Sequence, residues 1–343
     1  MSIFSKDLGI DLGTSNVVVY AEGKGIVLRE PSVVAVDKNT GKILKVGAAA
    51  KNMLGRTPGN VVAMRPLREG VVSDYELTQR MLAEFFRQIF KFSFVKPRVV
   101  IAVPSGITSI EERAVVQIAQ EAGARRVYLI EEPLAAALGT SLGFDGPDGH
   151  MVVDIGGGTT DVGVLTLNGL ANSASIKVAG DNFDEAIIRY LRKKYGLIVG
   201  QTIAEEAKIS VGTVYERKEP VETTVKGRDF KTGLPREISL SSTDMLEALR
   251  RPAHQIIEKI LAVLEQTTPE LVADIARNGI VLTGGGAQLW GMDKLITERT
   301  GMRCTVADDA DSCVAYGCGK SLSWINRMQE GPINFARRKL LKE

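Results

Sequence analysis

The chain has 343 residues, 44% of them hydrophobic and 24% charged, which is typical of a globular α/β protein of about two domains. Its formal net charge of +2 favours no nucleic-acid partner. The three cysteines lack paired metal-ligand spacing, which indicates a reducing, cytoplasmic home. No apolar run approaches the roughly 20 residues that span a bilayer, so any membrane contact is expected to be peripheral.

One pattern occurs twice along the chain. Residues 11–16 (Asp-Leu-Gly-Thr-Ser-Asn) and residues 154–160 (Asp-Ile-Gly-Gly-Gly-Thr-Thr) each lie between short apolar runs, which predicts a strand, a tight turn and a second strand. Further on, the apolar segments 101–106 and 280–285 are also alike, and a strand-helix pattern follows each hairpin. The repetition predicts an α/β protein with two similar lobes.

Two insertions are expected in these lobes, because a segment rich in turn signals and a longer, more polar segment interrupt the repeat. Helical spacing predicts helices at 76–90 and 243–264, and Ser109 with Glu112 predicts a capping box at the start of another. The expected division is 1–32 and 66–145 for the core of lobe I, 33–65 for its inserted subdomain, 146–180 and 245–315 for the core of lobe II, 181–244 for its inserted subdomain, and 316–343 for a return to lobe I with the C-terminal tail.

The two turns have the composition of phosphate-binding turns. Glycine lets backbone N–H groups surround an anion because no Cβ stands in the way, and threonine hydroxyls add donors. One such turn usually marks only a tight bend, but two copies, each preceded by an aspartate, predict two phosphate-binding turns that face each other. The residues expected there are Gly13, Thr14, Ser15, Asn16, Gly156, Gly157, Gly158, Thr159 and Thr160.

Asp11 and Asp154 head these turns, where their carboxylates would repel phosphates unless a cation intervened. Mg²⁺ prefers hard oxygen ligands and retained waters, so the pair predicts a magnesium site, with capping of the turns as the alternative. Glu132 follows a predicted strand, and its carboxylate is the best candidate to orient the attacking water of a phosphoryl transfer. Its alternative role is that of a helix N-cap.

Six segments spread over nearly the whole chain match a known family. They are 11–14, 56–60 (Arg-Thr-Pro-Gly-Asn), 103–108 (Val-Pro-Ser-Gly-Ile-Thr), 131–133 (Glu-Glu-Pro), 154–160 and 282–287 (Leu-Thr-Gly-Gly-Gly-Ala). Through them the sequence resembles the actin-like ATPases. The glycine turns alone indicate the superfamily, which includes sugar kinases and heat-shock chaperone ATPases. Segments 56–60 and 103–108 resemble the MreB group of bacterial actin homologues in particular.

The resemblance implies an actin-like fold, with two duplicated ribonuclease-H-like lobes that close over ATP and Mg²⁺. In that fold Glu132 and Thr159 would position the attacking water. The residues that would surround the adenosine are Glu205, Lys208, Gly284, Gly285 and Gly286. One departure from actin is that the first turn carries Ser15 and Asn16 and no lysine, so charge compensation would depend more on Mg²⁺ and backbone donors.

The resemblance also implies slow ATP hydrolysis and ATP-dependent assembly into paired filaments at the inner face of the membrane. Such filaments organise cell-wall synthesis together with membrane-embedded morphogenetic proteins and maintain rod shape. Phe92 and Phe94, between lysines, are the candidate lipid contact, since aromatic and basic residues suit an anionic interface. Their alternative role is packing in the core at the entry of a strand.

Two other readings of the same superfamily remain. A sugar kinase would need an aspartate base in a second, sugar-lined pocket, which no segment presents clearly. A chaperone would need a peptide-binding domain, for which no length is left after the ATPase core.

Overall fold

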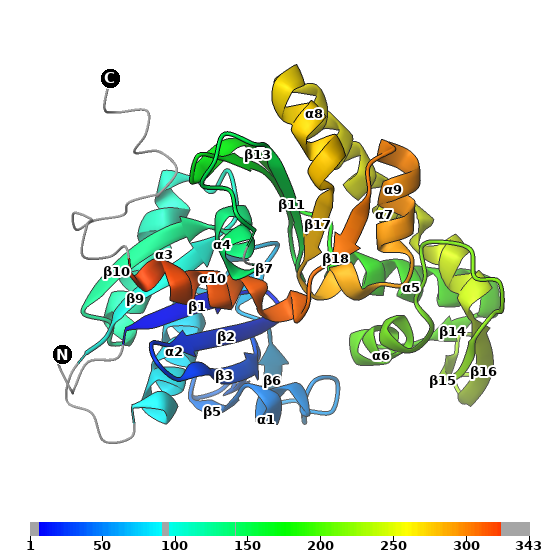
Figure 1. Ribbon diagram of the computed structural model, residues 1–343. Helices are drawn as coiled ribbons and strands as arrows, with labels where there is room; N and C mark the ends of the chain where they lie inside the picture. The colour runs from blue at the N-terminus through cyan, green and yellow to red at the C-terminus, as the bar shows by residue number, and fades with distance from the viewer. Residues whose placement is uncertain (1–6, 91–95, 141, 324–343) are drawn as a thin grey trace.

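The computed structural model describes residues 7–90, 96–140 and 142–323. Two lobes, each built around a five-stranded sheet, lie side by side (Figure 1). The first sheet has the order β10-β9-β1-β2-β3. Its strands are β1 (Leu8–Leu12), β2 (Asn16–Ala21), β3 (Gly25–Pro31), β9 (Arg98–Val103) and β10 (Arg126–Glu131).

The second sheet repeats this topology in the order β13-β12-β11-β17-β18. Its strands are β11 (His150–Ile155), β12 (Thr160–Thr166), β13 (Gly169–Ile176), β17 (Ile280–Thr283) and β18 (Cys304–Val306). In both sheets the first three strands in sequence pair antiparallel, while the last two add in parallel on the other side of the first strand. The repeat seen in the sequence is therefore a repeat of topology.

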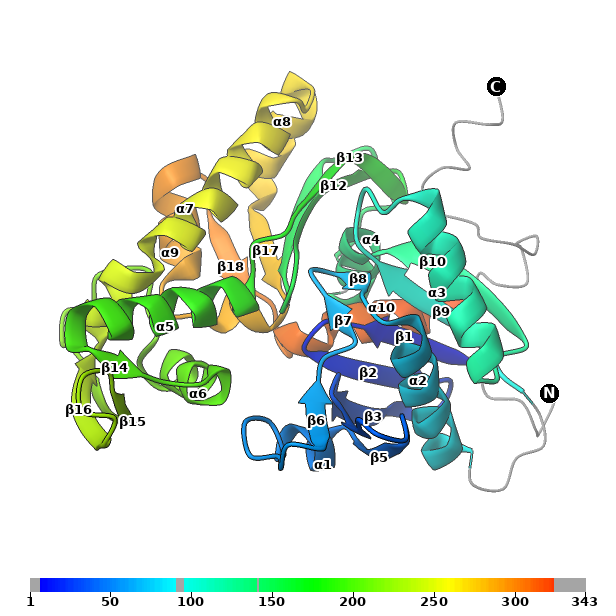
Figure 2. The same cartoon turned by 180° about the vertical axis from the view of Figure 1, so that it is seen from behind.

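Helices cover both sheets and close the core between them (Figures 1 and 2). In the first lobe these are α2 (Tyr75–Ile89), α3 (Ser109–Ala122), α4 (Glu132–Gly139) and α10 (Cys313–Ser321). In the second they are α5 (Gly180–Tyr195), α7 (Ser242–Glu265), α8 (Pro269–Asn278) and α9 (Met292–Thr300). A Cβ at Gly317 would lie 1.7 Å from Ala135 O, so glycine is what allows α10 to approach α4 this closely.

A buried cluster joins the lobes. It includes Val100 and Tyr128 from the first sheet, Val152 and Leu165 from the second, and Leu134 from α4. Burial of this apolar surface stabilises the lobe interface, at roughly 25 cal/mol per Å² of area removed from water. The two lobes are therefore joined by a packed core.

The inserted segments form the outer parts of each lobe. The first insertion contains β4 (Val34–Asp37), β5 (Ile43–Val46), α1 (Ala48–Lys51) and β6 (Val61–Met64), and the hairpin of β7 (Leu67–Arg68) and β8 (Val71–Val72) follows it. The second contains β14 (Leu197–Ile198), α6 (Gln201–Val211), β15 (Glu222–Asp229) and β16 (Pro235–Ser241). Helices α1 and α6 face each other across the gap between the lobes (Figures 1 and 2).

The capping box of α3 lies one residue before the predicted one. Thr108, not Ser109, is the N-cap: its hydroxyl accepts from Glu111 N at 3.3 Å, and Glu111 Oε2 accepts from Thr108 N at 2.9 Å. The predicted pairing with Glu112 is wrong because Glu112 is buried on the helix face that packs inward. Both pairs fit the same spacing, so spacing alone does not choose between them.

Candidate functional site

The turns that follow β1 and β11 meet at the centre of the molecule. A Cβ at Gly157 would lie 2.1 Å from Ser15 Oγ, and a Cβ at Gly158 would lie 2.4 Å from Thr14 Oγ1. The Thr14 hydroxyl also accepts from Gly70 N at 3.0 Å. Glycine at these positions therefore lets the two turns touch with their backbones exposed to the pocket between them.

This polar pocket lies between the two turns that the sequence predicts to bind phosphate. It is lined by Gly13 to Asn16, by Gly156 to Thr159, and by Asp11, Asp154 and Glu132. Among the described residues that line it, none carries a positive side chain. Phosphates bound here would depend on backbone N–H groups, hydroxyls and a cation from solution.

Asp11 and Asp154 occupy equivalent places, each as the next-to-last residue of its strand. Burial, with repulsion from Asp154, raises the pKa of Asp11 to about 7. Burial raises the pKa of Asp154 to about 6, although its Oδ1 accepts a hydrogen bond of 2.6 Å from Thr283 Oγ1. Two neighbouring carboxylates that resist ionisation in this way would be stabilised by a bound cation.

The donor set of the pocket fits Mg²⁺, because carboxylate oxygens are the ligands this ion prefers. In the part of the chain that the structure describes, no three His, Cys, Asp or Glu side chains are arranged to hold a metal ion by themselves. The remaining ligands of an ion here would therefore come from phosphates and water, as Mg²⁺ commonly accepts.

Glu132 reaches the same pocket from the first turn of α4. The N-cap of α4 is Glu131, so the alternative role of Glu132 as an N-cap is wrong. Burial, with repulsion from Asp161, Asp154 and Asp11, raises the pKa of Glu132 well above its usual range. A carboxyl group in this environment is poised to exchange a proton with a neighbouring acid or a water.

Asp161, a neighbour of Glu132 that does not itself line the pocket, was missed by sequence reasoning. It lies fully buried on β12, directly opposite Asp154 in the strand register, and its Oδ1 accepts from Ser105 N at 2.7 Å. Burial raises its pKa to about 7. The signal in the sequence was a single acidic residue in an otherwise apolar strand, since buried acids are rare without a role or a partner.

A second cavity, of about 450 Å³, opens from the phosphate pocket and shares Ser15, Gly156 and Gly157 with it. It lies where the sequence expects the adenosine, because Glu205, Lys208, Gly285 and Gly286 line it. Lys208 Nζ lies 2.8 Å from Asp184 Oδ1 and donates to Gly180 O at 3.0 Å. Burial raises the pKa of Asp184 to about 6 against the attraction of Lys208.

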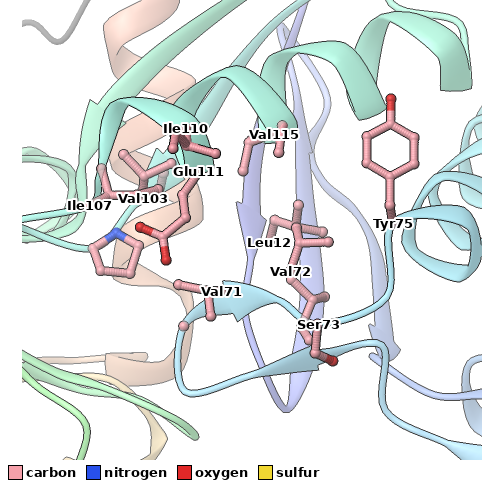
Figure 3. A pocket seen from close by; sticks show the side chains of 15 residues that line it. Leu12, Val71, Val72, Ser73, Tyr75, Val103, Ile107, Ile110, Glu111 and Val115 are labelled. Atoms are coloured by element: carbon pink, nitrogen blue, oxygen red, sulfur yellow. The ribbon is translucent and has the colours of Figure 1, made fainter.

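An apolar pocket of about 290 Å³ lies behind the first turn, and Leu12 and Gly70 line both it and the polar pocket. Figure 3 shows the side chains of Leu12, Val71 and Val115 gathered between α3 and the strands. Such a lining offers few groups for an anion. The polar pocket and the 450 Å³ cavity are therefore the candidate nucleotide site.

The structure brings the expected site residues together with few departures. Thr160 is fully buried and its hydroxyl donates to Val178 O at 2.7 Å, so its side chain holds the turn from behind. Gly284, with φ +82, lines the polar pocket and not the 450 Å³ cavity, and it packs against Ile155, where a Cβ would lie 2.3 Å from the carbonyl oxygen. Phe92 and Phe94 lie outside the described residues. Among the helices of residues 7–90, 96–140 and 142–323, none combines the length and the apolar composition that a membrane span requires.

The sequence matches the family described as MreB/Mbl protein over residues 5–330. It is 48% identical over 327 residues to the cell shape-determining protein Mbl of Bacillus cereus, covering 95% of this chain and 98% of that protein. It is also 48% identical over 330 residues to the cell shape-determining protein MreB of Escherichia coli strain K12, covering 94% and 95% of the two chains.

A solved structure gives the same result for the fold. MreB5 of Spiroplasma citri bound to ADP superposes with a TM-score of 0.90 at 36% identity, over 94% of this chain and 98% of that one. The same protein bound to AMPPNP gives a TM-score of 0.88 at 35% identity, over 94% and 97% of the two chains. The predicted actin-like α/β fold is confirmed, and the chain belongs to the MreB/Mbl family of cell shape-determining proteins.

Proposed function

We propose that this protein is an ATP-dependent, filament-forming bacterial actin that assembles at the inner face of the membrane and organises cell-wall synthesis to maintain rod shape. The observation that carries the proposal is the polar pocket between two facing glycine turns, the first preceded by the half-buried Asp11 and the second by the buried Asp154. Its continuity with the 450 Å³ cavity provides room for the nucleoside. MreB5, which is bound to ADP or AMPPNP in its solved structures, supports the choice of nucleotide.

In this proposal the turn residues, with Glu205, Lys208 and the glycines 284–286, bind ATP. Asp11 and Asp154 would hold Mg²⁺, which supplies charge neutralisation at the phosphates. Glu132 and Thr159 position the attacking water. Burial and the negative charge of the buried Asp161 raise the pKa of Glu132. Hydrolysis is slow because the pocket offers no positive side chain among its described residues to stabilise the developing charge.

We further propose that the domains and subdomains expected from the sequence are the functional subdomains of the filament subunit. The two inserted subdomains, 33–65 and 181–244, face each other across the nucleotide site. The distance between them would therefore depend on whether nucleotide is bound. The partners proposed are other copies of the chain in paired protofilaments, the inner membrane surface and the membrane-embedded cell-wall synthesis machinery. No nucleic acid is among them.

The first test is electron microscopy of the purified protein on anionic lipid, with ATP and Mg²⁺ and without nucleotide. Filaments that form on lipid only with nucleotide are the expected result. Monodisperse particles in both conditions, with ATP bound, would contradict the proposal. ATP turnover that rises strongly on addition of a hexose or glycerol would then favour the sugar kinase.

The membrane contact is proposed at Phe92 and Phe94 and has its own test. Replacing both by serine should reduce flotation of the protein with anionic liposomes, because each aromatic ring contributes apolar area at the interface. A suitable control is Phe230→Ser, which removes an aromatic ring that is 55% exposed on the hairpin of β15 and β16. Undiminished flotation of the folded double variant would end this assignment.

A further inference from the structure

Asp184 is a buried acid on α5 that does not itself line the nucleoside cavity. Its side chain is 2% exposed, and its Oδ1 lies 2.8 Å from Nζ of Lys208, whose side chain is 17% exposed. Lys208 lines the cavity from α6, which lies beside α5 (Figure 2). A buried ion pair is weak support for stability, because an apolar pair of similar volume is often as good. The pair is therefore better explained by its effect on the position of Lys208.

A second contact fixes the ammonium group of Lys208, whose Nζ donates to Gly180 O at 3.0 Å. Gly180 is the first residue of α5, and its N–H donates to Gly156 O at 3.1 Å. The next residue, Asp181, donates from its N–H to Gly157 O at 2.8 Å. The ammonium group is thus held, through the first turn of α5, against the second of the two glycine turns. This chain of contacts would set its distance from phosphates bound there.

One donor of Lys208 is left for a ligand. An ammonium group has three N–H donors. Asp184 and Gly180 account for two of them, and Lys208 has no third hydrogen-bond or ion-pair partner within the part of the chain that the structure describes. Since both partners lie on α5 and the side chain lines the cavity, the third donor is the one available to a bound nucleoside.

Glu205 supplies an acceptor beside this donor. It lies three residues before Lys208 on α6 and lines the same cavity, and residues three apart on a helix are neighbours. Its Oε2 lies 2.9 Å from Lys51 Nζ, which leaves Oε1 to accept from a ligand. A ribose presents two adjacent hydroxyls, and each hydroxyl both donates and accepts. One fixed donor next to one fixed acceptor suits this pair of hydroxyls.

We propose that Asp184 is a positioning residue for recognition of the ribose: it holds Lys208 so that the third N–H donor of Lys208 meets one ribose hydroxyl while Glu205 accepts from the other. This inference rests on the proposed function as an ATP-binding protein and gives its site a preference for ribonucleotides over deoxyribonucleotides. Without Asp184 the long side chain of Lys208 would sample several rotamers, and ordering it on binding would cost affinity.

The test compares ATP with 2′-deoxy-ATP and 3′-deoxy-ATP on the full-length protein, by competition against a fluorescent ATP analogue. Wild type should bind both deoxy analogues roughly tenfold more weakly than ATP, because each lacks a hydroxyl that bonds to a charged group. Lys208→Ala should lose this preference for one analogue, which identifies the hydroxyl that Lys208 contacts. Asp184→Ala should lose the preference for the same analogue. A merely structural role would weaken binding of all three nucleotides and leave their ratios unchanged.

A double variant tests whether Asp184 acts through Lys208. Asp184→Ala combined with Lys208→Ala should give the same ratios as Lys208→Ala alone. Asp184→Asn keeps the size of the side chain without its charge, and it serves where the alanine variant does not fold. Glu185→Gln is the matched control, because Glu185 is an exposed acid on the same helix that pairs with Arg189. It should keep the ratios of the wild type.

Equal affinity of the wild type for ATP and both deoxy analogues would overturn the inference while leaving nucleotide binding intact. A preference that survives unchanged in Lys208→Ala, or in a folded Asp184 variant, would overturn it as well. The same holds for a further change of the ratios when Asp184→Ala is added to Lys208→Ala. Failure of the folded wild type to bind ATP at all would overturn the proposed function and this inference together.

Discussion

Lys51 Nζ lies 2.9 Å from Glu205 Oε2, and this ion pair joins α1 of one lobe to α6 of the other. Two more pairs cross the same gap. Arg65 forms an ion pair with Asp181 at 2.5 Å, and Lys177 Nζ lies 3.4 Å from Glu69 Oε2. Glu205 also lines the nucleoside cavity, so its pairing with Lys51 bridges the cavity at one side.

Lys51→Ala should speed nucleotide release. The pair is partly exposed, so its loss should weaken closure by about 0–1 kcal/mol, which corresponds to a release rate up to roughly fivefold higher. The measurement is stopped-flow release of a fluorescent ADP analogue. Lys226→Ala is the control, because Lys226 pairs with Glu237 within the hairpin of β15 and β16 and lines neither nucleotide cavity. Equal release rates for Lys51→Ala and the wild type would show that this pair does not hold the nucleotide.

The sequence predicted the parts of the site that have a local pattern. Gly157 and Gly158 lie in a turn whose composition indicates phosphate binding. The register of the two sheets places that turn against Thr14 and Ser15. The cross-cleft pairs could not be predicted, because Lys51 and Glu205 come together only when both insertions fold. Asp161 was missed because its only local signal is one acidic residue within a strand, and because its partner Ser105 comes from the other lobe.

Glu132→Gln should lower phosphate release by roughly 10²-fold, the lower range for loss of a general base or acid, while ATP binding and filament assembly persist. The amide keeps the size of the side chain but removes the proton exchange that its raised pKa indicates. A phosphate-release assay on preformed filaments measures the effect. Glu121→Gln, an exposed change on α3, should hydrolyse ATP like the wild type. Unchanged hydrolysis in Glu132→Gln would reject Glu132 as the water-positioning group.

The nucleotide-free protein should lose stability as pH rises from about 4 to about 7. Burial raises the pKa of Asp11, Asp154 and Asp161 above 3.8, to about 7, 6 and 7, so the folded state binds more protons than the unfolded chain in this window. The unfolding free energy therefore decreases with pH there, and this stability is fully present only below the unfolded pKa. Thermal unfolding without nucleotide at pH 5 and pH 7.5 measures the difference.

Asp161→Asn should make this pH dependence weaker. The substitution removes one of the carboxyl groups whose pKa burial raises, so the variant should melt at a higher temperature than the wild type at pH 7.5. Asp148→Asn, an exposed change, is the control and should leave the profile unchanged. A profile of Asp161→Asn that is parallel to that of the wild type would mean that Asp161 does not titrate in this window.

Gly157→Ala should abolish tight ATP binding, because its Cβ would lie 2.1 Å from Ser15 Oγ and 2.8 Å from Ser15 Cβ. The two turns would have to separate, and the backbone N–H donors of one turn would no longer face those of the other. Gly146→Ala, at a glycine with nothing within 4 Å of the added Cβ, is the control and should bind ATP normally. Adding Ser15→Gly to Gly157→Ala removes both close atoms, so the double variant should recover part of the ATP affinity lost in the single variant. Absence of any recovery, in a folded double variant, would mean that the glycine is required by its own backbone and not by its contact with the opposite turn.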